Sequence, residues 1–107
     1  MIDEGNLFDS IPEAISEELF TELMQGRDFR IERIVSKGHT SPDTGWYDQD
    51  ENEWVVVLKG EAEITFADQR IERLSVGSYI TIPARTKHKV TWTAPDVETV
   101  WLAIHYK

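Results

Sequence analysis

The chain has 107 residues, a length that suffices for one domain and is too short for two. Acidic residues outnumber basic ones by 20 to 11, and the formal net charge of −9 argues against nucleic acid or an anionic membrane as a partner. Cysteine is absent, which excludes disulfides and thiolate metal ligands. No apolar run approaches a membrane span, and the acidic first residues do not resemble a signal peptide, so we expect a cytoplasmic protein.

Residues 10–26 carry the clearest helical pattern in the sequence. Ser10 and Glu13 have the spacing of a capping box, and Gly26 is a natural stop. Apolar residues recur on one face at helical spacing: Ile15, Leu19, Phe20, Leu23 and Met24. The pattern predicts one α-helix over 10–26, within an N-terminal segment of residues 1–27, that packs outside the main domain or against a partner.

After Gly26 the hydrophobic pattern changes to a period of two residues. Short apolar segments alternate with turns that contain glycine, proline or charged residues. The segments are 29–35, 54–58, 62–66, 71–74, 79–82, 88–92 and 99–106. This spacing predicts that residues 28–107 form an all-β antiparallel sandwich or barrel.

Two spaced motifs stand within this region. In the first, Glu53 is followed after six residues by Gly60. In the second, Gly77 is followed after five residues by Pro83, and His88 comes five positions after that proline. Together they resemble the paired motifs of the cupin superfamily. The resemblance implies a jelly-roll-like double-stranded β-helix barrel in which Glu53 and His88 bind one metal.

Strand alternation also directs Glu53 and His88 inward. Glu53 shares its parity with the apolar Val55, and His88 shares its parity with Val90 and Trp92. A buried carboxylate needs a cation or hydrogen-bond donors to offset its lost hydration. The alternation and the motif spacing therefore agree on the same two residues as metal ligands.

The third ligand is less clearly indicated, because this chain departs from the cupin pattern. Cupins usually carry two histidines just before the glutamate. Depending on the spacing, the matching positions here are Trp46 and Asp48, or Tyr47 and Gln49. Asp48 is the preferred substitute because it is anionic, and Gln49 offers a neutral oxygen.

The second motif departs as well, with Arg85 in place of its second glycine and Trp92 in place of its distal asparagine. Arg85 is either an anion-binding side chain at the barrel mouth or a solvated turn residue. The predicted pocket residues are Trp46, Tyr47, Arg85 and Trp92. His39 and His105 are candidates for a fourth ligand or a proton-transfer group.

Such a ligand set favours a divalent first-row metal, with Mn and Fe preferred and Ni, Co or Zn also compatible. No motif of a kinase, a dinucleotide-binding enzyme or a serine hydrolase occurs. Two classes remain open. The first is a metal-dependent enzyme acting on a small polar or anionic molecule, such as a dioxygenase, isomerase or decarboxylase. The second is a non-catalytic metal- or ligand-binding cupin. The resemblance, which covers residues 28–107, also implies a homodimer.

Overall fold

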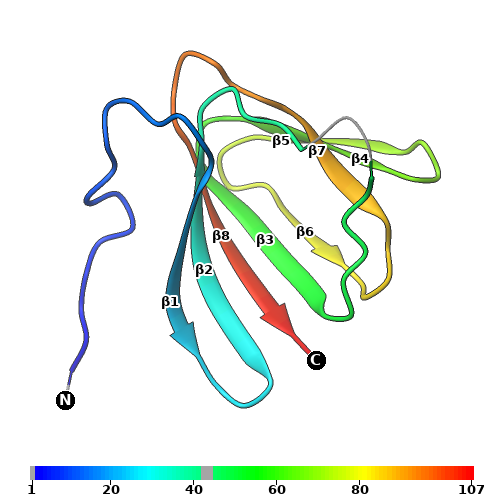
Figure 1. The fold of residues 1–107 in the computed structure, drawn as a ribbon, viewed down its shortest axis with the longest axis horizontal. Coiled ribbons are helices and arrows are strands. Elements are labelled where there is room, and N and C mark those ends of the chain that lie inside the picture. The colour runs from blue at the N-terminus through cyan, green and yellow to red at the C-terminus, as the bar shows by residue number, and fades with distance from the viewer. Residues whose placement is uncertain (1, 42–44) are drawn as a thin grey trace.

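The computed structural model describes residues 2–41 and 45–107, which form two antiparallel β-sheets (Figure 1). The larger sheet has the strand order β1-β2-β8-β3-β6, and the smaller has the order β5-β4-β7. The strands of the larger sheet are β1 (Leu19–Gln25), β2 (Phe29–Ser36), β3 (Asn52–Lys59), β6 (Tyr79–Ile82) and β8 (Thr99–Tyr106). Those of the smaller sheet are β4 (Ala62–Phe66), β5 (Ile71–Leu74) and β7 (His88–Thr93).

The hydrophobic core lies between the two sheets. Its buried residues are Val55, Val57, Ala62, Ile64, Phe66, Leu74, Ile82, Trp101 and Ala103. Val55 and Val57 of β3 alternate with side chains that point away from the core, as do Trp101 and Ala103 of β8. The period-two pattern of the sequence therefore corresponds to one buried face on each strand.

All seven segments predicted as strands are strands in the structure, with bounds that differ by at most two residues. The central strand β8 pairs with β2 along its whole length, from Phe29↔Tyr106 to Ser36↔Thr99. On its other side β8 pairs with β3. The all-β fold class predicted from the sequence is confirmed.

The helix predicted over residues 10–26 is wrong. Residues 10–18 adopt no regular structure, and Leu19–Gln25 form β1, which pairs with β2 around a tight turn at Gly26. Ser10 has a left-handed φ of 58°, which is incompatible with its predicted role as a helix cap. Backbone pairing along the edge of β2 outweighs the local helical pattern, as tertiary contacts commonly outweigh intrinsic propensity.

The first residues are attached to the outer face of the larger sheet by Arg33. Its guanidinium group donates hydrogen bonds to the carbonyl oxygens of Leu7 at 3.2 Å and Asp9 at 2.6 Å, and to Thr21 Oγ1 at 3.4 Å. Part of the predicted N-terminal segment, residues 1–27, thus packs onto the sandwich, and β1 extends its larger sheet. Within the described residues we find no helix of a length and hydrophobicity that could cross a membrane.

Candidate functional site

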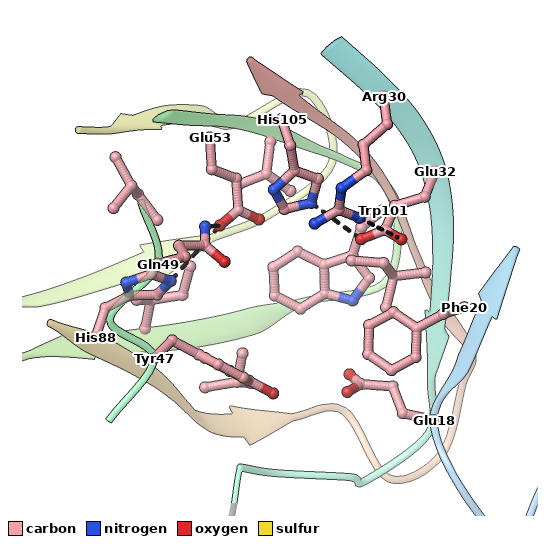
Figure 2. A pocket seen from close by; sticks show the side chains of 15 residues that line it. Glu18, Phe20, Arg30, Glu32, Tyr47, Gln49, Glu53, His88, Trp101 and His105 are labelled. Atoms are coloured by element: carbon pink, nitrogen blue, oxygen red, sulfur yellow. Dashed lines mark hydrogen bonds and ion pairs between the residues drawn. The ribbon is translucent and has the colours of Figure 1, made fainter. Parts of the chain in front are cut away.

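A cavity of about 160 Å³ lies between the sheets. Its apolar walls are formed by Phe20, Ile34, Val55, Ile64, Ile82, Val90 and Trp101. The polar side chains gather in two groups, and Figure 2 shows one group around Glu53 and His88 and the other around Glu32 and Arg30. An apolar cavity with a few converging polar groups is the usual form of a small-molecule site.

The first polar group consists of Gln49, Glu53 and His88. Gln49 Nε2 donates a hydrogen bond of 3.0 Å to Glu53 Oε1. His88 Nε2 lies 3.6 Å from the same oxygen. The side chains of Glu53 and His88 are only 12% and 5% exposed, so this carboxylate and imidazole meet almost out of contact with bulk water.

Backbone pairing positions these three residues. Glu53 lies near the start of β3 and pairs with Ile82 of β6 on one side and His105 of β8 on the other. His88 begins β7, and its backbone forms a bridge with Tyr47 in the preceding loop.

The same loop is fixed a second time beyond Tyr47. The backbone N–H of Arg85 donates to the carbonyl oxygen of Gln49 at 2.8 Å. Arg85 has a left-handed φ of 64°, which explains why the motif prefers glycine at this position. The loop that carries Gln49 is therefore held against the two segments that flank His88.

The orientation of the His88 ring is set by Thr86. His88 Nδ1 lies 2.8 Å from the carbonyl oxygen of Thr86, which can only accept a hydrogen bond, so Nδ1 carries the proton. The neutral ring then turns an unprotonated Nε2 toward Glu53. Metal-binding histidines commonly donate their second ring nitrogen to a backbone carbonyl in this way.

Opposing effects determine the ionisation of the Glu53–His88 pair. Burial raises the pKa of Glu53, but its contacts with His88, His105 and Gln49 outweigh burial and hold the pKa below its usual value of 4.5. Burial lowers the pKa of His88, but Glu53 and the Thr86 carbonyl outweigh burial and raise the pKa above its usual value of 6.5. When no metal ion is bound, these shifts favour a protonated His88 beside an ionised Glu53.

The second polar group contains Arg30, Glu32 and His105. His105 Nε2 lies 3.0 Å from Glu32 Oε1, and Arg30 lies 3.3 Å from the other Glu32 oxygen. The guanidinium group of Arg30 also reaches Glu51 at 3.3 Å. His105 Nδ1 is buried and has no hydrogen-bond partner within the described residues. A buried polar atom without a partner costs about 1–3 kcal/mol, so this nitrogen calls for an explanation.

The structure separates the two candidates for the third ligand. Gln49 lines the cavity and contacts Glu53. Asp48 is 38% exposed, lies 3.6 Å from Arg85, and is not among the residues that line the cavity. Arg85 is itself 68% exposed and also lies outside the cavity. The geometry thus favours Gln49 over Asp48 as the neighbour of Glu53 and His88.

Of the three predicted aromatic wall residues, the structure places only Tyr47 at the cavity. The Tyr47 and His88 rings are 5.6 Å apart. Trp46 lies outside the cavity, with Lys89 Nζ 4.4 Å from the centre of its ring.

Trp92 also lies outside the cavity, against the expectation from strand alternation. In the pairing of β4 with β7, Ile64 is opposite Val90 but Glu63 is opposite Trp92, which leaves one extra residue on β7. Such a β-bulge changes the face on which the following side chain lies. The Trp92 ring instead lies under the guanidinium group of Arg73, at 4.2 Å.

The two other histidines differ in position. His105 lines the cavity. His39 does not, and its Nδ1 accepts a hydrogen bond from the backbone N–H of Lys37 at 2.9 Å. His105 is therefore the additional histidine that can contact a ligand in the cavity.

Sequence reasoning missed several cavity residues: Glu18, Phe20, Arg30 and Glu32. On β2, the alternation of Arg30 and Glu32 with Phe29 and Ile31 indicated a solvent-facing charged side. In the structure the charged side faces the cavity and the apolar side faces outward. A strand that lines a polar cavity shows the same alternation as one that faces water, so the sequence held no signal to distinguish them.

Within residues 2–41 and 45–107, no three or more His, Asp or Glu side chains form a group placed to hold a metal ion. Around Glu53 and His88 the third side chain is the amide of Gln49. This end of the cavity therefore offers one carboxylate, one imidazole and one amide.

Comparison with known proteins places this chain in a family. Residues 33–105 match the model of the cupin domain. The chain is similar to the solved structure of a "putative mannose-6-phosphate isomerase" from Ralstonia eutropha JMP134, with 37% identity, a TM-score of 0.94 and 99% of each chain covered. Two more distant structures show the fold alone.

One of these is a cupin superfamily protein from Desulfitobacterium hafniense DCB-2, with 19% identity, a TM-score of 0.76, and 99% of this chain and 93% of that chain covered. The other is an RmlC-like cupin with a double-stranded β-helix fold from Methanocaldococcus jannaschii, with 16% identity, a TM-score of 0.72, and 99% and 92% covered. No curated protein matches the chain. The family match spans most of the sequence, and the chain belongs to the cupin domain family.

Proposed function

We propose that this cupin binds one divalent first-row metal ion at Glu53 and His88, beside Gln49, and that the metal serves a small polar or anionic molecule in the cavity. The observation that carries the proposal is the approach of His88 Nε2 to Glu53 Oε1 at 3.6 Å. In the neutral ring both atoms are hydrogen-bond acceptors, because the Thr86 carbonyl holds the ring proton on Nδ1. Two buried acceptors at this distance need a cation or a proton between them.

The spacing of these two atoms fits a metal ion. Nitrogen and oxygen ligands bind such metals at about 2.1 Å, so two adjacent ligand atoms lie roughly 3.0–3.5 Å apart. The observed 3.6 Å needs only a small adjustment. Without metal, a proton on His88 provides the positive charge, in agreement with the raised pKa of this residue.

Gln49 is the proposed third group at the metal. In the observed orientation its NH₂ group donates to Glu53, and turning the amide over would present its oxygen to the metal instead. The three protein ligands would be one carboxylate, one imidazole and one amide, which together carry a single negative charge and bind a metal ion weakly. Three ligands also leave coordination positions for water or a small molecule. When bound, the metal would polarise a carbonyl group or lower the pKa of a bound water molecule.

Metal content tests the proposal directly. We expect protein purified without added metal to carry about one equivalent, and Glu53→Ala and His88→Ala to carry none while still unfolding cooperatively. Gln49→Ala is expected to weaken metal binding by about 10- to 100-fold, the usual effect of losing a supporting residue. Asp48→Ala is the matched control and should keep full occupancy.

The variants also have outcomes that would contradict the assignment. If Glu53→Ala and His88→Ala both retain full metal occupancy, the metal is bound elsewhere. If Asp48→Ala loses the metal while Gln49→Ala keeps it, Asp48 is the third ligand and the loop rearranges on binding.

A second candidate is a non-catalytic, structural metal cupin. The two candidates differ in whether the bound metal keeps exchangeable water, as catalytic sites do. For the Mn²⁺-loaded protein we expect strong relaxation of water protons that small oxo-acids suppress. The absence of both effects would leave the structural role. The name of the 37%-identical relative makes sugar-phosphate isomerisation one reaction to assay.

We also infer that the chain acts as a cytoplasmic homodimer. The outer face of the larger sheet carries apolar side chains that are only partly buried: Phe29, Ile31, Trp54, Val56, Leu102 and Ile104. In a chain with a net charge of −9, a continuous face of this kind is typical of an interaction surface. A second copy covering these six residues would bury apolar side chains, while the neighbouring Arg33 on the same face is already bound by the carbonyl oxygens of Leu7 and Asp9.

A further inference from the structure

His105 is a cavity histidine in which one ring nitrogen has no hydrogen-bond partner among the described residues. Its side chain is 5% exposed, it lines the cavity, and its Nδ1 has no hydrogen-bond partner within the described part of the chain. Buried polar atoms in folded proteins are nearly always hydrogen-bonded, to protein, water or ligand.

The protein determines which kind of partner Nδ1 needs. Nε2 of His105 lies 3.0 Å from Glu32 Oε1, and a carboxylate oxygen can only accept, so Nε2 carries the proton. Arg30 lies against the other oxygen of Glu32 and holds this carboxylate in place. In the neutral form of the ring Nδ1 is then an acceptor, and its partner must be a donor.

Among residues 2–41 and 45–107, no neighbouring side chain supplies that donor. Glu53 pairs with His105 across adjacent strands, so the two side chains share one face of the sheet. In Figure 2, His105 lies between Glu53 and Glu32. The Glu53 carboxylate is an acceptor and is already bound by Gln49. The donor must then come from a molecule inside the cavity.

We propose that His105 Nδ1 accepts a hydrogen bond from a hydroxyl group of the ligand, so that the site selects small hydroxylated molecules that reach from Glu53 and His88 to His105. The proposal rests on the function proposed above, in that the ligand is held at the Glu53–His88 end. The cavity of about 160 Å³ suits a molecule of a few carbon atoms, and its apolar walls accommodate the carbon chain. Short hydroxy acids and polyols fit this description.

Two acids that differ in one hydroxyl group test the proposal. Glycerate and lactate share a carboxylate and a 2-hydroxyl group, but only glycerate has a hydroxyl on the third carbon. We expect the metal-loaded protein, measured by calorimetry, to bind glycerate about tenfold more tightly than lactate, the effect of one hydrogen bond that a buried site is built to make.

Two variants of His105 separate the roles of its nitrogens. His105→Asn keeps an acceptor atom near the position of Nδ1, and His105→Gln keeps an amide donor near the position of Nε2, toward Glu32. We expect glycerate to bind about tenfold more tightly than lactate in His105→Asn and about equally tightly in His105→Gln. A merely structural histidine would give equal effects in the two variants.

A second readout does not depend on metal. In metal-free protein with ¹⁵N-labelled histidine, we expect the Nδ1 resonance of His105 to have the position of an unprotonated nitrogen and to shift on addition of glycerate but not of lactate. If this shift occurs and the protein takes up no metal when metal is added, the metal proposal fails and the role of His105 stands. If metal is bound but glycerate and lactate bind equally, or glycerate produces no response, the role of His105 is overturned.

Discussion

At the scale of single residues, the two cavity histidines differ in which ring nitrogen the protein holds by a hydrogen bond. The Thr86 carbonyl occupies Nδ1 of His88 and leaves Nε2, whereas Glu32 occupies Nε2 of His105 and leaves Nδ1. Both free nitrogens belong to cavity-lining residues close to one carboxylate. These two hydrogen bonds thus determine which ring nitrogen each histidine leaves available in the cavity.

The Glu53–His88 pair predicts a pH window for the stability of the metal-free protein. The folded-state pKa of His88 is raised, so its contribution is complete below the usual value of 6.5 and is lost as the pH rises through the raised value. The folded-state pKa of Glu53 is lowered, so its contribution is complete above 4.5 and is lost as the pH falls through the lowered value. Both contributions are complete between these two values.

Denaturant unfolding of metal-free wild type and Glu53→Gln measures this window. We expect the difference in free energy of unfolding between them to be largest between pH 4.5 and 6.5 and to shrink on both sides. A difference that stays constant from acid to alkaline pH would show that the pair is not ionised as inferred.

At the scale of elements, single backbone features decide where side chains go. The extra residue on β7 turns Trp92 out of the cavity, and the left-handed Arg85 shapes the turn that precedes His88. Gly60, which ends the first motif, has a φ of 85°, and a Cβ atom there would lie 2.7 Å from the Thr99 Cα. The glycine of this motif is therefore required both by its backbone conformation and by the close approach of β8.

Alanine substitutions at Gly60 and Gly77 separate the effect of backbone conformation from the effect of the close approach of β8. Gly77 has a φ of 88°, but a Cβ atom added there would have no neighbouring atom within 4 Å, so Gly77→Ala should cost only the backbone strain, about 1–2 kcal/mol. Gly60→Ala adds a clash with the backbone of Thr99, and we expect a loss of about 3 kcal/mol or more. Urea unfolding measures both, and equal losses would show that β8 moves away at little cost.

At the scale of the whole molecule, the two faces of the larger sheet differ. Its inner face lines the core and the cavity, and its outer face carries apolar side chains. The inward side chains of β3 and β8 close the core, and the outward ones, such as Val56 and Leu102, remain half-buried. The exposed apolar residues of β1 lie on the edge strand of this sheet. The helix prediction had assigned the same residues to a packing surface.

The outer face predicts the effect of a charge on assembly. We expect the wild type to sediment at twice the 12.4 kDa chain mass and Leu102→Lys to sediment as a monomer, because an unpaired buried charge is costly in an interface. Ile71→Lys, on an exposed residue of β5, is the matched control and should remain dimeric. A wild type of 12.4 kDa at micromolar concentration would contradict the proposed dimer.

Much of this architecture could be predicted from local pattern. Strands such as Ala62–Phe66 and Thr99–Tyr106 were predictable because alternation records which face of each strand is buried. The inward positions of Glu53 and His88 followed from the same rule, and both residues line the cavity. These features depend on neighbours within one strand, and the sequence contains them directly.

Other features depend on contacts between distant segments, and only the tertiary structure decided them. Leu19–Gln25 form a strand because β2 offers an edge with which to pair, despite a helical pattern. Gln49 reaches the site, and Asp48 does not, because Tyr47 pairs with His88. Arg30 faces the cavity because of where β2 lies in its sheet. The sequence alone determined which residues alternate along each strand. Long-range pairing between strands determined which of the two faces of a strand lines the cavity, because the pairing energy comes from contacts between segments that are distant in the sequence.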